Sequence, residues 1–237
     1  TDILLQFENK MKDLKYNGTI RTSSFQLGDL LSTKTLGKTA FKITTKGTKL
    51  QNRSLQGTIS GDIAEIYLNR YNYQKIRVDG KYDGSGFEGK MDVNDPNLKA
   101  SFDGVVDLTK KLPVFNFDLL VNNADINALH LTKEYKDSRL SFYGNTNMIG
   151  NSLNNLNGYL MLDSIRFINA GEELVMDQLL FESEVSGKSS KFTITSDLIN
   201  GNFEGDFKYS TIPQTISSIV ENYIPALSGK NIPGTWK

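Results

Sequence analysis

The chain has 237 residues, and its 27 basic and 27 acidic side chains give a formal net charge of zero. Charges of both signs are interspersed, without a basic cluster interleaved with aromatics, so nucleic acid is not expected as a partner. Cysteine is absent, which excludes disulfides and thiolate metal sites, and no apolar run approaches the ~20 residues of a membrane-spanning helix.

The first residues, TDILLQFENKMKDLK, fit two secondary structures. A helix would align Ile3, Phe7, Met11 and Leu14, whereas a strand through Ile3, Leu5 and Phe7 would be followed by a loop. We favour the strand for this part of residues 1–14. Because the sequence starts on Thr1 and shows no signal-peptide layout, we expect a piece of a longer protein.

Period-2 alternation dominates the following sequence and is bounded by Gly, Asn, Asp and Ser clusters, which is typical of antiparallel strands. The segment FEGKMDVNDPNLKASFDGVVDL, residues 87–108, shows the pattern clearly, with apolar and charged residues in opposite phases. Gly89 and Gly104 stand in the apolar phase, where a protein core would need bulk. We expect these glycines to relieve crowding in a curled sheet, or to leave space for a non-protein occupant.

A long repeat is visible at an offset of 101 positions. The following five residues each have a counterpart at this offset: Phe41, Leu55, Gly57, Phe102 and Gly104 match Phe142, Leu156, Gly158, Phe203 and Gly205. Two tandem copies of one β unit, near 38–113 and 139–213, explain this agreement. Chance alignment of similar strands is the alternative. We therefore divide the chain into a first β-groove unit, 1–137, and a second, 138–209.

Only STIPQTISSIVENYIPAL has a clear helical pattern. Its apolar residues recur at helical spacing, and Pro213 suits a first turn. We expect an amphipathic helix at 210–227, followed by a polar tail at 228–237. Its polar face carries no cation, which disfavours membrane docking. We expect it to cover the groove, with the alternative that it packs on the outer sheet face; the lid residues would be Ile212, Ile216, Val220 and Tyr223.

Signals of catalysis and metal binding are weak. His130 is the single histidine, and no nucleophile elbow accompanies it. The segment DVNDPN, with Asp92, Asn94, Asp95 and Asn97, could offer oxygen ligands to calcium, but its Asp-Pro and Asn residues favour a turn between two strands. We therefore expect neither an enzyme nor a cofactor.

The segments YNGTI, FQLGDLL, LGKTAFKITTKGTKL and SLQGTISGDI, with YNYQKIRVDGKYDGSGFEGKMDVNDPNLKASFDGVVDL, carry a resemblance. Over residues 16–227 the chain resembles the periplasmic repeat region of the TamB family, AsmA-like proteins, in the form found in Bacteroidota. Its most specific parts are the Tyr-x-Tyr before the VDG strand and the DPN turn followed by FDG. The family's N-terminal membrane anchor and C-terminal barrel-docking region are not found in this sequence.

The resemblance implies an all-β fold, a curled antiparallel sheet that forms an open U-shaped groove from tandem repeats. It also implies an intermembrane bridge, anchored in the inner membrane and lying in the periplasm, that shields phospholipid or other acyl chains. An outer-membrane barrel assembly protein would be a partner. The groove lining would be Leu55, Ile59, Ile63, Val78, Tyr82, Phe87, Met91, Val93, Leu98, Phe102, Val106, Leu108, Phe115, Phe117 and Leu119 in the first copy, and Leu156, Leu160, Leu162, Phe192, Ile194, Phe203 and Phe207 in the second.

Two alternatives remain open at the level of the sequence. The chain could be a scaffold that guides outer-membrane proteins by pairing strands at an open sheet edge. It could instead be a closed β-sandwich or solenoid with a dry core, acting in adhesion.

Overall fold

A computed structural model describes residues 2–10, 13–31, 33, 35–49, 54–132, 137–169, 171–187, 189–198 and 200–206. Their strands are β1 (Asp2–Lys10), β2 (Asp13–Gln26), β3 (Leu36–Lys49), β4 (Leu55–Leu68), β5 (Tyr71–Asp83), β6 (Gly86–Asn94), β7 (Leu98–Asp107), β8 (Val114–Asp125), β9 (Arg139–Ile149), β10 (Asn157–Asn169), β11 (Glu172–Ser186), β12 (Ser189–Ser196) and β13 (Asn200–Gly205). Two short helical segments are added, α1 (Leu27–Leu31) and the 3₁₀ turn η1 (Leu153–Asn155).

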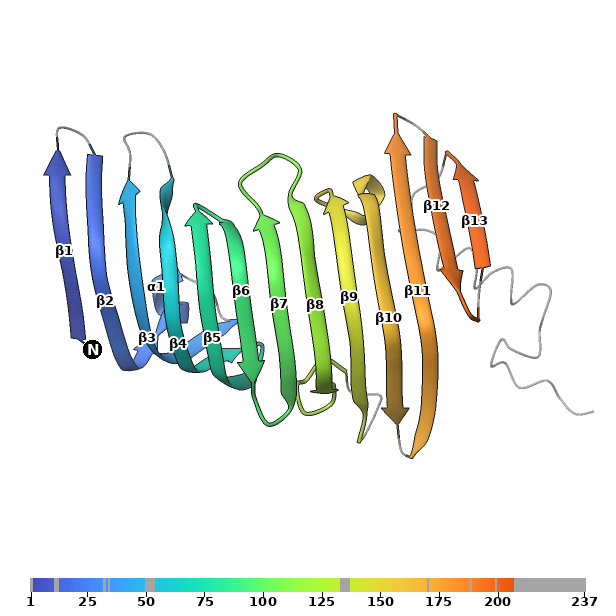
Figure 1. The fold of residues 1–237 in the computed structure, drawn as a ribbon, viewed down its shortest axis with the longest axis horizontal. Coiled ribbons are helices and arrows are strands. Elements are labelled where there is room, and N and C mark those ends of the chain that lie inside the picture. The colour runs from blue at the N-terminus through green and yellow to red at the C-terminus, as the bar shows by residue number, and fades with distance from the viewer. Residues whose placement is uncertain are drawn as a thin grey trace, which may run out of the picture.

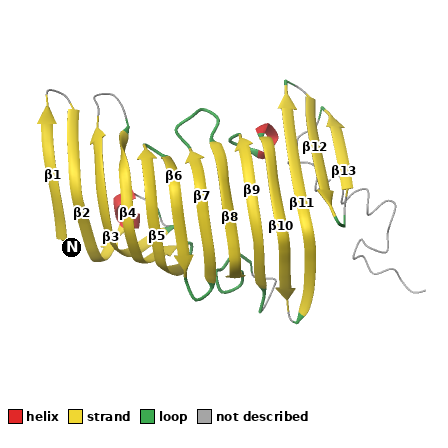
Figure 2. Cartoon of the chain, in the orientation of Figure 1, coloured by secondary structure: helices red, strands yellow, loops and turns green. Residues whose placement is uncertain are grey.

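The thirteen described strands form one sheet in which spatial order equals chain order, from β1 at one edge to β13 at the other (Figure 1). Every neighbouring pair is antiparallel, so the sheet is a continuous meander in chain order. Figure 2 shows how little helix accompanies it. The predicted all-β, open antiparallel sheet is confirmed, and these strands do not form a closed sandwich.

The N-terminal segment is a strand, as favoured. Ile3, Leu5 and Phe7 pair with Ile20, Gly18 and Tyr16 in β2. The alternative helix through Ile3 and Phe7 is wrong, because both residues lie in β1, which spans Asp2–Lys10. Leu14, the last residue of that alternative, lies in β2, which begins at Asp13.

The repeat of 101 positions is visible in the strand pairing. Strands β3, β4 and β5 correspond in position to β9, β10 and β11, and β6 and β7 correspond to β12 and β13. Gly57 faces Tyr82 on β5, and their counterparts 101 positions further on, Gly158 and Ser183, also face each other. The sheet is nevertheless continuous between the two copies, because β8 pairs with β9 across the boundary at 137/138.

The sheet is curled by a band of irregular pairing that crosses several strands at the same level. The register shifts between Thr22 and Phe25 in β2, near Ala40 in β3 and between Val121 and Ala124 in β8, while Lys75 in β5 has a positive φ of 52°. An extra residue in one strand bends that strand and increases its twist. Figure 1 shows the lower ends of β2 to β5 turning sharply to one side. The bend therefore lies at the level of these bulges.

The best-buried apolar cluster lies inside this bend. Val121 and Ala124 of β8 pack with Leu129 from the segment after it, and Leu129 is only 2% exposed. Tyr71 and Tyr73 of β5 pack against the same cluster. The cluster thus joins side chains of β5 to those of β8 and β9, strands that do not pair with β5.

Several expectations fall outside the described residues. Phe207, the helix at 210–227 with its lid residues Ile212, Ile216, Val220 and Tyr223, and the tail at 228–237 all belong to this part of the chain.

Candidate functional site: an apolar groove face

One side of the sheet collects the predicted lining residues. Ile63 faces Ile76, Val78 faces Met91, and Phe102 faces both Met91 and Leu119, and directly opposed residues lie on the same side of a sheet. We call this side the groove face and the opposite side the polar face. Strand register places the following predicted residues on the groove face: Leu55, Ile59, Ile63, Val78, Tyr82, Phe87, Met91, Val93, Leu98, Phe102, Val106, Phe115, Phe117, Leu119, Leu160, Leu162, Phe192, Ile194 and Phe203.

Two predicted residues do not lie within strands. Leu108 follows the last residue of β7 and is half exposed. Leu156 is the residue between η1 and β10, where its carbonyl oxygen accepts a hydrogen bond from Ser183 Oγ. Both sit at the rim of the sheet rather than on its groove face.

Charge is divided sharply between the two faces. Among the described side chains of β1 to β9, the register places a single charged residue on the groove face, Lys49 at the end of β3. The polar face carries rows of alternating sign, and two of its ion pairs are Arg77 with Asp62, 3.3 Å, and Lys90 with Asp103, 3.0 Å. All four partners are more than half exposed, so these pairs add little stability. They keep the polar face hydrated.

The groove face is hollowed over β1 to β5. A pocket of about 520 Å³ lies there, within the usual size range of small-molecule sites. Leu55, Ile59, Ile63 and Tyr82 line it as predicted. The sequence analysis missed the other lining residues, which are Leu5, Phe7, Leu14, Tyr16, Ile20, Leu27, Thr39, Phe41, Ile43, Thr45 and Ile66. Most of them continue the same alternation into earlier strands, so the pattern could have identified them.

Phenylalanine rings connect the lining from strand to strand. The ring of Phe102 lies with its centre 6.2 Å from that of Phe87 and 5.0 Å from that of Phe117. In the second copy, Phe192 lies 5.0 Å from Phe181 and stacks on Phe203 at 5.5 Å. Such ring contacts favour a continuous apolar surface across neighbouring strands.

Neighbouring aromatic side chains fill the space beside several glycines of the groove face. A β-carbon at Gly47 would lie 2.1 Å from the hydroxyl of Tyr16, and one at Gly80 would lie 2.8 Å from the ring of Phe87. A β-carbon at Gly57 would meet the hydroxyl of Tyr82 at 2.9 Å. Aromatic rings that cover glycines restore lost packing in a sheet. Of the two expectations for the glycines, relief of crowding and space for a non-protein occupant, the close contacts at these three positions favour the first.

The rings of Tyr16 and Tyr82 meet above β3 and β4. Their hydroxyls contact each other, Tyr16 donates to the carbonyl oxygen of Gln56 at 3.1 Å, and Tyr82 OH lies 2.9 Å from Thr45 Oγ1. Burial, reinforced by the contact with Tyr82, raises the pKa of Tyr16 above its ordinary value. Tyr16 is therefore neutral at physiological pH. The two tyrosines form a polar rim at one end of the apolar pocket, opposite Leu27 of α1.

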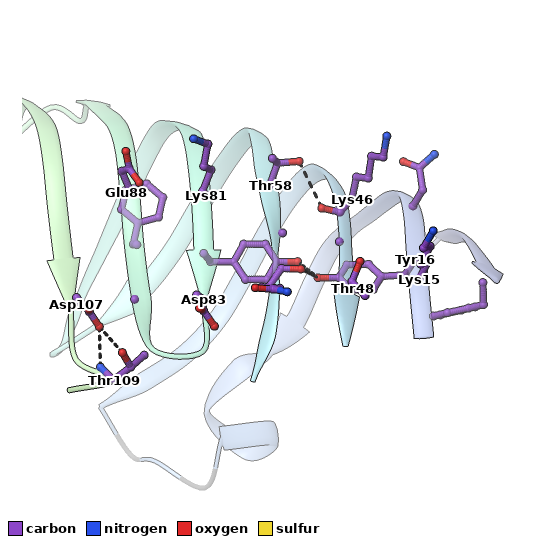
Figure 3. Close-up of a pocket in the computed structure, with 18 of the residues that line it drawn as sticks. Lys15, Tyr16, Lys46, Thr48, Thr58, Lys81, Asp83, Glu88, Asp107 and Thr109 are labelled. Atoms are coloured by element: carbon purple, nitrogen blue, oxygen red, sulfur yellow. Dashed lines mark hydrogen bonds between the residues drawn. The ribbon is translucent and has the colours of Figure 1, made fainter. Parts of the chain in front are cut away.

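A wider depression of about 1310 Å³ extends over β1 to β7 and is lined by residues of both faces, with Tyr16, Tyr82 and Phe87 from the groove face among them (Figure 3). Lys46, Thr58, Lys81 and Glu88 form one row across β3 to β6, because each faces the next in the strand register. At the strand ends, Asp107 Oδ1 accepts a hydrogen bond from the backbone of Thr109. The hydrogen bonds from Thr109 lower the pKa of Asp107.

The segment DVNDPN is a turn, as favoured over a calcium site. Asp95 N–H donates to the carbonyl oxygen of Leu98, and Leu98 N–H donates back to that of Asp95. The Asp95 carboxylate accepts hydrogen bonds from Tyr71 OH, 2.5 Å, and from the backbone N–H of Gln74 and Asn97. Within the described part of the chain, no group of three or more His, Cys, Asp or Glu residues could hold a metal ion.

His130 lies on the surface at the bend. It is exposed, has a positive φ of 58°, and its ring centre is 6.4 Å from that of Tyr71. The neighbouring segment instead contributes the buried Leu129 to the core.

The chain matches no family model, no curated protein and no solved structure. Among the described residues, no helix is long and apolar enough to cross a membrane.

Proposed function

We propose that this chain is a segment of a lipid-carrying groove, in which the groove face shields acyl chains from water. The observation that carries the proposal is the division of charge between the faces. An apolar surface that runs across β1 to β9 with one charged residue, Lys49, needs a cover. The described strands form a single sheet and place no second sheet over it.

Burial of acyl chains is energetically suited to such a surface. Each methylene group removed from water contributes about 0.8 kcal/mol. A groove that lacked a few such contacts at one point would therefore oppose the passage of a tail by several kcal/mol on this scale. The phenylalanine rows through Phe102 and Phe192 bridge successive strands and support passage without such a break.

The resemblance to the TamB family gives the proposal its biological setting. The chain would lie in the periplasm as part of a bridge anchored in the inner membrane, and phospholipid would move along the groove toward the outer membrane. An outer-membrane barrel assembly protein would bind regions not found in this sequence. The groove face holds lipid passively, and we assign no catalytic residue.

One observation favours a second function, strand pairing with a nascent outer-membrane protein. β1 pairs only with β2, so its other backbone edge is open for pairing within the described sheet. Ile3, Leu4 and Phe7 on this strand are each more than 60% exposed. Open apolar edges pair readily with other strands. In this alternative, the cargo would be bound at the edge rather than on the groove face.

A photocrosslinking experiment distinguishes the two functions. A benzoylphenylalanine residue is placed at position 102 or 203 on the groove face, and at 103 or 204, one residue further along each strand, as matched controls. Successive residues point to opposite faces of a sheet. We expect phospholipid to be captured from positions 102 and 203 but not from 103 and 204. A further probe at position 4, on the open edge strand β1, tests the second function. Equal lipid capture from both faces, or capture of protein at position 4 without lipid capture at 102 and 203, would refute the lipid groove.

A further inference from the structure

The hydroxyls of Tyr16, Tyr82 and Thr45 at the polar rim have fewer hydrogens than the hydrogen bonds that their contacts would require. Tyr16 OH contacts the Gln56 carbonyl oxygen and Tyr82 OH, and Tyr82 OH also contacts Thr45 Oγ1. Thr45 Oγ1 in turn lies 2.9 Å from the carbonyl oxygen of Thr58. This chain has four oxygen–oxygen contacts between two carbonyls, which have no hydrogens to donate. Each of the three hydroxyls has one hydrogen to donate, so three hydrogens serve four contacts.

One of the four contacts therefore has no hydrogen, whichever way the hydroxyls rotate. If Tyr16 and Thr45 donate to the two carbonyls, Tyr82 can donate to Tyr16 or to Thr45 but not to both. Ionisation of a tyrosine would remove a further hydrogen, and burial already raises the pKa of Tyr16. The cluster is thus a net acceptor, and a group that donates one hydrogen completes it.

The cluster is placed where the head of an amphiphile would lie. Tyr16 and Tyr82 border the apolar pocket near the strand ends; among the described side chains of β2 to β4, Leu14, Lys49 and Leu55 lie beyond them on the groove face. From Tyr16 the pocket continues past Ile20, about 13 Å further along β2, toward Phe41. A tail can follow this path while its head stays at the rim.

We propose that Tyr16, Tyr82 and Thr45 form a headgroup site for amphiphiles whose polar group donates a hydrogen bond, such as a hydroxyl next to an acyl or alkyl tail. The site rests on the proposed function, because its ligand needs the groove face to hold the tail. It adds chemical selectivity to a groove that otherwise binds tails without distinction.

Lys49 offers the competing chemistry. It lies on the same face, two residues beyond Gly47, and a cation there would attract a carboxylate, which donates no hydrogen. The hydroxyl cluster therefore predicts a ligand with a neutral, hydrogen-donating head, whereas Lys49 predicts a ligand with an anionic head.

Displacement of the neutral dye N-phenyl-naphthylamine from the whole chain tests the site. The competitors share one tail and differ in the head: dodecanol, its methyl ether and dodecanoate. We expect the alcohol to displace the dye at about a fivefold lower concentration than the ether, as one hydrogen bond of ordinary strength would give. In Tyr82→Phe, Tyr16 and Thr45 can each donate to a carbonyl, so the preference should fall to about one.

The control is Tyr159→Phe, which removes a hydroxyl bonded to Asn145 on the polar face and should keep the preference. Thermal unfolding of each variant shows whether it folds, and Thr45→Val gives a second test within the cluster.

Equal displacement by alcohol and ether in the wild type would overturn the headgroup site while leaving the groove intact. Preference for dodecanoate that is lost in Lys49→Gln would overturn it in favour of an anion site. Failure of all three competitors and of the dye to bind would overturn the groove itself.

Discussion

Asp95 has a buried carboxylate that accepts three hydrogen bonds from named donors. It is 1% exposed, and Tyr71 OH, Gln74 N–H and Asn97 N–H all donate to it. A buried charge is tolerated only with such partners. The carboxylate therefore fastens β5 to the turn between β6 and β7, at the level where the sheet bends.

Tyr71→Phe should destabilise the fold by about 1–3 kcal/mol at neutral pH, because a buried charged acceptor loses a donor. Burial, followed by the hydrogen bond to Asp95, raises the pKa of Tyr71 to about 12. The unfolded chain, with a tyrosine pKa near 10, loses its proton first as the pH rises. The stability that Tyr71 contributes is thus present below pH 10 and is lost between about pH 10 and 12.

Urea unfolding at pH 7 to 11.5 measures this effect. The difference in free energy of unfolding between wild type and Tyr71→Phe should be largest at neutral pH and should shrink above pH 10. Tyr67→Phe, at a 38% exposed position, is the control and should stay close to wild type at neutral pH. A Tyr71→Phe difference that is constant over the whole range would contradict the role given to Asp95.

At the scale of elements, the glycines of β5, β6 and β7 form a row. Gly89 faces Gly80 on one side and Gly104 on the other. A β-carbon at Gly89 would lie 2.3 Å from the carbonyl oxygen of Asp79 and 2.5 Å from the Cα of Gly80. Both are backbone atoms, which cannot move away as a side chain can. Glycine is needed here for the close approach of three strands.

Gly89→Ala is therefore expected to destabilise the sheet by about 1–3 kcal/mol, the usual range for overpacking. Gly201→Ala is the matched control in β13, where the nearest atom to an added β-carbon belongs to the mobile ring end of Phe203 at 3.1 Å. Thermal or urea unfolding compares the two variants. If Gly201→Ala proved as destabilising as Gly89→Ala, the row would have no special packing role.

The alternation of the sequence was sufficient to predict the strands and their apolar face, because period 2 determines which side chains share a side of a sheet. The Asp-Pro and Asn residues predicted the turn at Asp95. The offset of 101 positions recurs in the strand register, where Gly57 faces Tyr82 and Gly158 faces Ser183. The hydroxyl cluster could not be predicted, since Tyr16 and Tyr82 are 66 positions apart and meet only through the register of four strands. The bulges and Leu129 likewise depend on tertiary packing.

At the scale of the whole molecule, the sheet grows by one strand at a time. Each described strand pairs only with its neighbours, while side-chain contacts such as those of Tyr71 and Tyr73 with the Val121 cluster connect strands that do not pair. At about 4.8 Å per strand, thirteen strands extend about 60 Å.

Native mass spectrometry of the chain purified from cells tests the lipid groove most directly. We predict that wild type carries phospholipid and that Phe102→Asp combined with Phe203→Asp loses it while remaining folded, since a charge on the groove face repels tails. Asp103→Asn combined with Glu204→Gln changes only the polar face and should retain the lipid. A folded wild-type chain without any bound lipid, or equal lipid in both double variants, would contradict the account.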